Sequence, residues 1–564
     1  MRRLAFRIVC GVAVLGTVCG ASLLAQRGRG GAAEPPPLAQ PPALPTIAPQ
    51  NITDKDLLGG LSNPARWLTV SGDYTGQRHS PLKQITPANA GQLAAQWTFQ
   101  ANVPGKFEAT PIVIDGIMYF SGTLNHAWAI DGKTGKQLWH YQRTLPSAQE
   151  MKICCGTVNR GLAVYHDKLY MTTLDAHLVA LEMKTGKVVW DVPISDYKLG
   201  HAATQAPLVV KDKLIVGIAG GEFAIRGFLD AYNPENGERV WRFWTIPAPG
   251  EPGGDTWSAE SWERGGGPTW QTGSYDPALN LIYWGTGNPN PDFFGENRPG
   301  DNLYTTSLVA LDADTGKLKW HYQFTPHDTH DWDANQVPVL ADINFGGRAR
   351  KVVMAANRNG FFYVLDRATG ELLLGKPYVK TTWATEIGKD GRPIELPDQR
   401  PTPQGTMTCP DLYGGTNFMA PSFSPQTGLF YVTARETCMT YRAAAPPAAY
   451  KTGDRTMGGS MAFIPGTGAL RAIDPATGQM KWEIRQAAPG WAGVLTTASG
   501  LVFSGDNDGN FFAADAQTGK ELWKYQTGSS IYAPPTTYMI GDRQYVVMPS
   551  GTTITAVALP VASR

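Results

Sequence analysis

Two carboxylates lie one residue apart in the stretch HDTHDWDAN, which covers residues 327–335. If this segment is extended, Asp331 and Asp333 point to the same side of the chain, because side chains alternate along a strand. Like charges at that separation repel one another unless a cation lies between them. The pattern is therefore typical either of a solvated acidic turn or of a site for a hard cation, and the residues around it must distinguish the two.

Cysteine is the second residue type here that can do chemistry. Four cysteines follow the N-terminal apolar stretch, namely Cys154, Cys155, Cys409 and Cys438, and an even number in an exported protein suggests two disulfides. The residues alone favour pairing each of the adjacent cysteines with a distant one over a strained ring between neighbours. Because the chain has no C-x-x-C-H motif, we expect no covalently bound c-type haem in it.

The chain that must position these residues has 564 residues, of which 42% are hydrophobic and 17% charged, and its net charge is +1. It is long enough for a large core, and the charge gives no reason to expect nucleic-acid binding. Two arginines and an apolar run predict a signal peptide at residues 1–25, with an uncleaved membrane anchor as the alternative. Residues 26–60 are predicted to be a Pro-rich linker, and residues 61–564 a single domain.

A repeat with the form A-x-[D/E/N]-x-x-x-G-x-x-x-W organises this domain and predicts an all-β fold. Each copy is expected to form a strand, a tight turn and a second strand. A period of roughly 50 residues with four strands per unit is typical of a β-propeller, in which a tryptophan from each blade docks against its neighbour. The copies with tryptophan are AIDGKTGKQLW (129–139), ALEMKTGKVVW (180–190), AYNPENGERVW (231–241), ALDADTGKLKW (310–320), AIDPATGQMKW (472–482) and AADAQTGKELW (513–523).

The spacing of the copies predicts eight blades. A seventh copy, at 364–374, has lost its tryptophan, and the turn glycines Gly370 and Gly478 are 108 residues apart, which leaves room for another unit. The stretch SPQTGLFYV, at 424–432, is interpreted as the remnant of that unit. We expect the segment around Trp97 to complete the last blade.

Together, the tryptophan repeats, the adjacent cysteines and the acidic pair resemble the quinoprotein alcohol dehydrogenases, which use pyrroloquinoline quinone (PQQ). The resemblance covers essentially the whole chain after about residue 60. It implies that Cys154 and Cys155 bond to each other and lie against one face of the quinone, that Cys409 bonds to Cys438, and that Trp270 in GGGPTW stacks on the opposite face.

The resemblance also implies the remaining contacts to PQQ. Arg160 matches an arginine that pairs with a quinone carboxylate, and Arg358 matches one beside the quinone oxygen. Pro268 stands where some members place a polar contact, and Thr269 is considered as its substitute. The other expected contacts are Glu108, Thr204, Ala219, Gly220, Gly221, Asn417 and Trp491.

The family's metal ligands match Glu222, Asn288 and Asp331, which all offer oxygen to a hard cation. Calcium-type members usually carry a small uncharged residue two positions after the catalytic aspartate, whereas lanthanide-type members carry a second aspartate. Asp333 stands at that position, so the chain resembles the lanthanide-dependent subgroup, with Ca²⁺ as the alternative. His327 and His330 flank the acids and are interpreted as structural or as support for the ligands.

The activity implied is the oxidation of primary alcohols to aldehydes. Asp331 would act as the general base, and Arg358 would stabilise developing negative charge on the quinone oxygen. The expected location is the periplasm, and the expected electron acceptor is a soluble cytochrome c. The sequence is compatible with a homodimer but does not determine the oligomeric state. The competing interpretations are a non-enzymatic propeller that serves as a scaffold for protein–protein interaction and a PQQ enzyme acting on sugars.

Overall fold

The protein is described by a computed structural model that covers residues 47, 48, 50–258 and 260–560. The predicted signal peptide, residues 1–25, lies outside the described residues. In the described part the only α-helix is α1 (Asp54–Gly59), and Ile52 beside it is buried, within the stretch predicted as linker. Short 3₁₀ turns are η1 (Gly60–Ser62), η2 (Ala90–Gln92), η3 (Thr123–Asn125), η4 (Tyr197–Leu199), η5 (Gly221–Phe223), η6 (Gly254–Thr256) and η7 (Ser261–Arg264).

The first four large sheets follow one another along the chain, and every pairing in them is antiparallel. The strands of the first are β1 (Arg66–Trp67), β4 (Ile112–Ile114), β5 (Ile117–Gly122), β6 (His126–Asp131) and β7 (Gln137–Gln142). Those of the second are β8 (Ala163–Tyr165), β9 (Lys168–Thr172), β10 (His177–Glu182) and β11 (Val188–Pro193). The third has β12 (Leu208–Val210), β13 (Lys213–Gly217), β14 (Phe228–Tyr232) and β15 (Arg239–Trp244), and the fourth β16 (Ser274–Asp276), β17 (Leu281–Gly285), β18 (Ser307–Asp312) and β19 (Leu318–Gln323).

Four more large sheets and one two-stranded sheet make up the rest of the strands in the described residues. The fifth has β20 (Val339–Phe345), β21 (Arg348–Ala356), β22 (Phe361–Asp366) and β23 (Leu372–Pro377), and the small sheet β24 (Ala384–Ile387) and β25 (Pro393–Glu395). The sixth has β26 (Thr406–Thr408), β27 (Ser422–Ser424), β28 (Leu429–Ala443), β29 (Gly459–Ile473) and β30 (Met480–Gln486). The seventh has β2 (His79–Ser80), β31 (Leu495–Thr497), β32 (Leu501–Gly505), β33 (Asn510–Asp515) and β34 (Glu521–Gln526), and the eighth β3 (Ala94–Gln100), β35 (Thr536–Ile540), β36 (Arg543–Ser550) and β37 (Thr553–Ala558).

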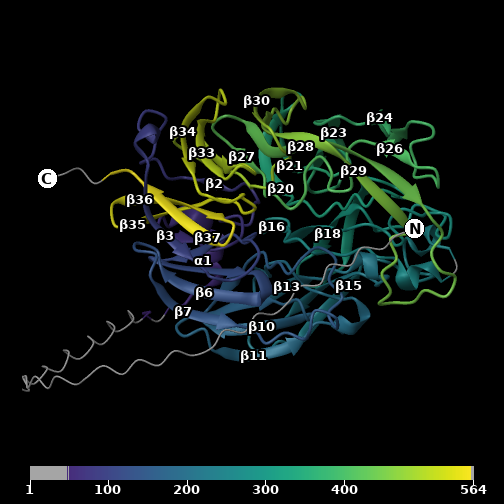
Figure 1. Cartoon of the computed structure of the whole chain (residues 1–564), viewed down its shortest axis with the longest axis horizontal. Helices are drawn as coiled ribbons and strands as arrows, with labels where there is room; N and C mark the ends of the chain where they lie inside the picture. The colour runs from purple at the N-terminus through teal and green to yellow at the C-terminus, as the bar shows by residue number, and fades with distance from the viewer. Residues whose placement is uncertain (1–46, 49, 259, 561–564) are drawn as a thin grey trace, which may run out of the picture. The chain divides into compact units, whose positions relative to one another are not determined.

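An N-terminal strand completes the last sheet, as the sequence predicted. Strand β3, which contains Trp97, pairs antiparallel with β37, and the two strands lie side by side (Figure 1). A second early strand, β2, pairs parallel with β31 of the seventh sheet. One core cluster accordingly combines residues from both ends of the domain, such as Val113 and Val557.

Tryptophans of the repeat lie against the turn glycine of the following copy. The Trp139 indole Nε1 donates a hydrogen bond to the carbonyl oxygen of Met183 at 2.9 Å, and its ring covers Gly186. Trp97 covers Gly135 in the same way. In the copy that lost its tryptophan, Lys376 and Leu374 lie beside the next turn glycine, Gly478. These side chains are therefore packing elements between successive sheets.

The remnant predicted at 424–432 is not a separate unit. These residues form the turn between β27 and β28, which belong to the same sheet as β29 and β30 and hence as the repeat at 472–482. The 108-residue gap instead contains the small β24–β25 sheet, strand β26 and the long β28–β29 hairpin. The additional sheet is the last one, β3 with β35–β37, which has no copy of the full repeat.

Among the described residues, none of the helices is both long and apolar enough to cross a membrane.

Candidate functional site

A cavity of about 500 Å³ is lined by all of the residues predicted to bind the cofactor or the metal except Thr269, the suggested substitute for a polar contact at Pro268. They come from loops spread over the described chain, from Glu108 after β3 to Trp491 after β30. The full set is Glu108, Cys154, Cys155, Arg160, Thr204, Ala219, Gly220, Gly221, Glu222, Trp270, Asn288, Asp331, Asp333, Arg358, Asn417 and Trp491.

One part of the cavity is cationic. Arg160 Nη2 lies 3.0 Å from Glu108 Oε2, and Arg160 Nη1 donates to Thr204 Oγ1 at 2.8 Å. Lys106 Nζ lies 3.4 Å from the other oxygen of Glu108, so two cations share a single carboxylate. Burial lowers the pKa of both Lys106 and Arg160, because the charged forms are poorly solvated there. This excess of positive charge suits an anionic ligand such as a carboxylate.

The cavity also has flat apolar surfaces. Cys154 and Cys155 form a disulfide with each other, and Cys409 bonds to Cys438, as the family resemblance implied. The prediction from the residues alone, that each adjacent cysteine pairs with a distant one, is wrong. The indole of Trp270 is 9% exposed and lies 4.8 Å from the Arg160 guanidinium. An aromatic face beside a disulfide ring and cationic groups fits a flat, negatively charged, conjugated guest.

Thr269 does not supply a polar contact in the cavity. Its Oγ1 donates to the carbonyl oxygen of Phe228 at 2.5 Å and accepts a hydrogen bond from Ile218 N at 2.9 Å. The side chain is fully buried among the strands, and the residue is not part of the cavity wall. The prediction that Thr269 makes the polar contact missing at Pro268 is therefore wrong. Its hydroxyl already donates one hydrogen bond and accepts another within the protein.

Asp333 anchors the opposite, acidic part of the cavity. Its Oδ1 accepts from the backbone N–H of Asn288 at 2.7 Å, and its Oδ2 accepts from Trp270 Nε1 at 2.9 Å. Arg358 Nη2 lies 2.9 Å from the same Oδ2, and Arg358 Nη1 donates to the carbonyl oxygen of Asp331 at 2.8 Å. The aromatic platform, the arginine and the acidic pair are thus joined in one hydrogen-bonded unit.

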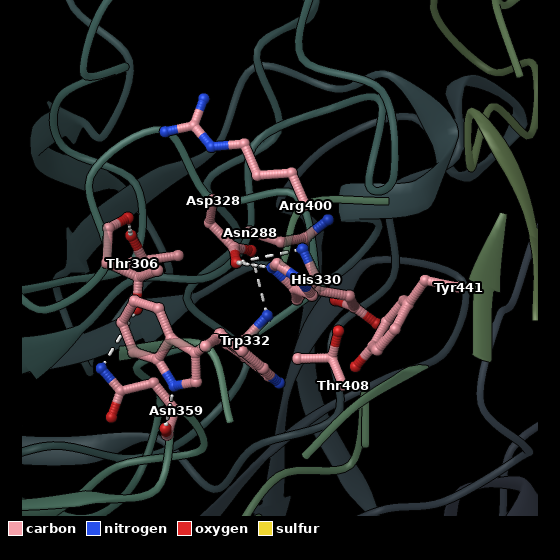
Figure 2. A network of polar contacts seen from close by, with 12 residues as sticks. Asn288, Thr306, Asp328, His330, Trp332, Asn359, Arg400, Thr408 and Tyr441 are labelled. Carbon is pink, nitrogen blue, oxygen red and sulfur yellow. Dashed lines mark hydrogen bonds and ion pairs between the residues drawn. The ribbon is translucent and has the colours of Figure 1, made fainter. Parts of the chain in front are cut away.

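The loop that presents Asp331 is held in shape by Asp328. Asp328 Oδ1 accepts from the backbone N–H of His330 at 3.1 Å, and its Oδ2 accepts from that of Trp332 at 3.0 Å (Figure 2). Asp331 itself has a φ of 61°, in the left-handed region that few non-glycine residues adopt. The segment is therefore not extended at Asp331, and hydrogen bonds from the backbone to the Asp328 side chain hold the loop that positions the acid.

Asp331 has the features of a proton acceptor. Its Oδ1 is buried without a hydrogen-bond partner, and the nearest guanidinium nitrogen, Arg358 Nη1, is 3.8 Å away. Burial and the neighbouring carboxylates Asp333 and Asp292 raise the pKa of Asp331 well above its ordinary value. An unpartnered carboxylate oxygen beside a cavity can accept a proton or coordinate a cation.

Glu222 and Asn288 are the other residues predicted to be metal ligands. Burial and the charge of Asp333 raise the pKa of Glu222. Asn288 Oδ1 lies so close to Gly221 that a Cβ there would come within 2.6 Å of it, so the glycine is required by this approach. These oxygens fit a hard cation, whereas Cys154 and Cys155, which lie near Glu222, are disulfide-bonded and cannot act as thiolate ligands.

The histidines beside the acids do not line the cavity. His327 Nδ1 lies 2.8 Å from the carbonyl oxygen of Gly300, and His330 stacks on Trp332 with ring centroids 4.2 Å apart. Both contacts agree with a structural interpretation. The aromatic residues Trp332 and Phe293 nearby are buried in core clusters.

Sequence reasoning missed some residues of the site. Lys106 lies two positions before the predicted Glu108, and Tyr532 stacks 5.9 Å from Trp491 and lies 3.5 Å from the Lys106 ammonium group. Asp292 is fully buried behind Asn288. Its position four residues after a predicted oxygen ligand is the signal in the sequence that points to it.

Comparison with known proteins places this geometry in a family. The family model described as "Glucose/ethanol/alcohol dehydrogenase, beta-propeller domain" matches residues 67–381 and 468–546. The quinoprotein alcohol dehydrogenase PedH of Pseudomonas putida is 40% identical over 532 residues, covering 89% of this chain and 88% of that protein. The lanthanide-dependent methanol dehydrogenase of Methylacidiphilum fumariolicum is 39% identical over 521 residues, covering 86% of this chain and 85% of that one.

Solved structures agree with these relatives. A europium-containing methanol dehydrogenase superposes with a TM-score of 0.84 at 35% identity, covering 90% of this chain and all of that chain. The quinohemoprotein alcohol dehydrogenase of Comamonas testosteroni gives 0.83 at 35% identity, over 89% of this chain and 81% of that one. These likenesses exclude the non-enzymatic scaffold. The chain belongs to the PQQ-dependent quinoprotein alcohol dehydrogenases and is an alcohol-oxidising oxidoreductase with a β-propeller domain.

Proposed function

We propose that this protein is a periplasmic alcohol dehydrogenase that oxidises primary alcohols to aldehydes with PQQ and a lanthanide ion. The observation that carries the proposal is the single cavity in which a cationic part, a flat indole and an acidic part are joined. Its domain is proposed to be an eight-bladed propeller with docked tryptophans, which the eight large sheets of the described residues and the indole–glycine contacts support.

The fit of PQQ rests on the chain's own groups. Arg160 and Lys106 would bind its carboxylates, and the Trp270 indole and the Cys154–Cys155 ring would hold the two faces of its ring system. When bound, PQQ supplies the redox chemistry by taking up the hydride of the alcohol. The remaining polar and backbone contacts are assigned to Glu108, Thr204, Ala219, Gly220, Gly221, Asn417 and Trp491.

Asp331 is proposed as the general base, with Oδ1 accepting the proton of the alcohol hydroxyl. That oxygen is buried and has no hydrogen-bond partner in the structure, so it is free to take the proton. Arg358 is fixed by the Asp331 carbonyl oxygen and by Asp333, and its guanidinium would stabilise negative charge that develops nearby. Both side chains are buried, which strengthens both interactions because the surroundings are less polar than water.

The metal is proposed to be held by Glu222, Asn288, Asp331 and Asp333. The second aspartate favours a trivalent lanthanide over Ca²⁺, because three carboxylates are offset better by a higher charge. The likeness to a lanthanide-dependent and to a europium-containing methanol dehydrogenase supports the same choice. Because this sequence has no C-x-x-C-H motif, electrons are proposed to leave to a separate cytochrome c.

The test is reconstitution of purified apoprotein with PQQ and either La³⁺ or Ca²⁺, followed by a dye-linked assay over a panel of alcohols and sugars. We expect alcohol oxidation that depends on PQQ and is higher with La³⁺. Activity with Ca²⁺ alone would overturn the choice of metal, and oxidation restricted to sugars would overturn the choice of substrate.

A further inference from the structure

The carboxylate of Asp292 lies behind the predicted metal ligands and is absent from the cavity wall. The residue is 0% exposed, in the loop between β17 and β18. Its Oδ1 accepts a hydrogen bond from Asn288 Nδ2 at 2.8 Å, and its Oδ2 is buried without a partner. A buried, half-satisfied carboxylate is costly, so its presence calls for a compensating interaction.

The hydrogen bond fixes which end of the Asn288 amide faces the site. Asp292, when ionised, can only accept hydrogen bonds, so the NH₂ group of Asn288 must turn toward it. The opposite atom, Oδ1, then lies against Gly221, the residue directly before Glu222. The amide oxygen is thereby held on the side where the other predicted oxygen ligands gather.

Charge balance gives Asp292 a second effect. Among the described residues no ion pair to Asp292 is formed, whereas Arg358 pairs with both Asp331 and Asp333. The negative charges of Glu222 and Asp333 act on Asp292, and Arg298 acts on it in the opposite sense. Among the described residues, ion pairs therefore reach only two of these four carboxylates, with Arg298 and Arg455 acting from farther away. A cation of high charge offsets the remaining negative charge better than a divalent one.

We infer that Asp292 is a positioning residue of the metal site, which orients the amide oxygen of Asn288 and, through its own charge, favours a trivalent cation. This inference rests on the proposed metal site and extends it to a residue outside the cavity. Groups that orient a metal ligand typically change metal affinity by roughly 10- to 100-fold when they are replaced.

The test measures metal binding without turnover. Full-length apoprotein is titrated with Tb³⁺, whose luminescence would be sensitised by the nearby Trp270, and bound Tb³⁺ is then displaced with La³⁺ or Ca²⁺. The variants are Asp292→Asn, which keeps an oxygen and removes the charge, and Asp292→Ala, which removes both. Asp508→Asn, at an exposed position far along the chain, is the matched control.

We expect Asp292→Asn to weaken Tb³⁺ and La³⁺ binding about 10-fold or more while changing Ca²⁺ binding much less, so that the preference for the trivalent ion falls. Asp292→Ala should weaken all three ions, and Asp508→Asn none. If both Asp292 variants bound the ions as the unmodified protein does, the inference about Asp292 would be overturned. The proposed metal site would not be affected by that result. Failure of the unmodified protein to bind Tb³⁺ would overturn the metal site and the inference together. Thermal unfolding confirms that each variant is folded, and the near-isosteric Asp292→Asn decides the matter if Asp292→Ala does not fold.

Discussion

Asp331 combines a strained backbone with an unpartnered oxygen, and this combination makes a sharp prediction. Asp331→Asn keeps the size of the side chain and its polar contacts but removes the ability to take up a proton. We expect turnover to fall by about 10²- to 10⁴-fold, the usual contribution of a general base. Bound PQQ, measured by its absorbance, should be retained, because Arg160 and Trp270 do not contact this carboxylate. Normal turnover in the variant would remove Asp331 as the base.

Asp333 makes the corresponding prediction for the metal. Asp333→Ala should abolish activity that depends on La³⁺ while the protein stays folded, because one charged ligand is lost from the site. The same substitution also removes the acceptor for Trp270 Nε1 and the partner of Arg358, so Asp333→Asn, which keeps an acceptor, is compared with it. Activity and thermal midpoint are measured for both, with Asp508→Ala as the exposed control. Full La³⁺-dependent activity in Asp333→Ala would contradict the lanthanide assignment.

The sequence indicated these residues through their types and local order, but not the backbone that presents them. A positive φ at a non-glycine residue such as Asp331 has no signal in the sequence, because it is imposed by hydrogen bonds to Asp328 from two backbone N–H groups. Asp292 was missed for a related reason. It touches the site only through Asn288, and such indirect contacts depend on how the loop folds.

At the scale of elements, the turn glycines of the repeat are predicted to matter through packing as well as through their backbone conformation. Gly186 has a φ of 71°, and a Cβ there would lie 2.7 Å from the ring of Trp139. Gly428 has a nearly equal φ of 68°, and nothing lies within 4 Å of its Cβ position. Substitution by alanine at either position should lower the free energy of unfolding by about 1–2 kcal/mol, because alanine tolerates the left-handed backbone less well than glycine. Gly186→Ala should cost about 1–3 kcal/mol more, because the indole must move.

Thermal or urea unfolding of the two variants measures this difference directly. A larger drop in the midpoint for Gly186→Ala than for Gly428→Ala is the expected result, and equal drops would show that the tryptophan does not hold the turn. The pair is matched in residue type and φ, so the comparison isolates the indole contact.

The elements themselves were largely predictable, since each repeat copy forms the last two strands of a sheet. The spacing between Gly370 and Gly478 led to a wrong prediction, because the gap contains no additional repeat unit. An inserted hairpin with long arms and a degenerate repeat add similar numbers of residues, and only strand pairing distinguishes them. The eighth sheet could not be recognised by the repeat, because its outer strand β3 comes from the other end of the domain.

At the scale of the whole molecule, the cavity draws its walls from loops between Lys106 and Tyr532, so a ligand bound there contacts groups contributed by most of the sheets. A ligand that binds only the folded state stabilises it by RT ln(1 + [L]/Kd), about 2.7 kcal/mol at 100 times Kd. PQQ and La³⁺ together should therefore raise the thermal midpoint of the full chain, and more than either does alone, because the acidic and cationic parts of the cavity are then both neutralised.

Glu222→Gln separates the two contributions to this stabilisation. The substitution keeps the shape of a residue in the acidic part of the cavity but removes one charge. It should therefore reduce the rise in thermal midpoint caused by La³⁺ and leave most of the rise in thermal midpoint caused by PQQ. Differential scanning fluorimetry at several ligand concentrations gives both values. An unchanged midpoint with saturating PQQ and La³⁺ would mean that this cavity does not hold them. An equal La³⁺ response in Glu222→Gln would mean that the ion binds elsewhere, because a cation coordinated by the acidic part must respond to the loss of one of its negative charges.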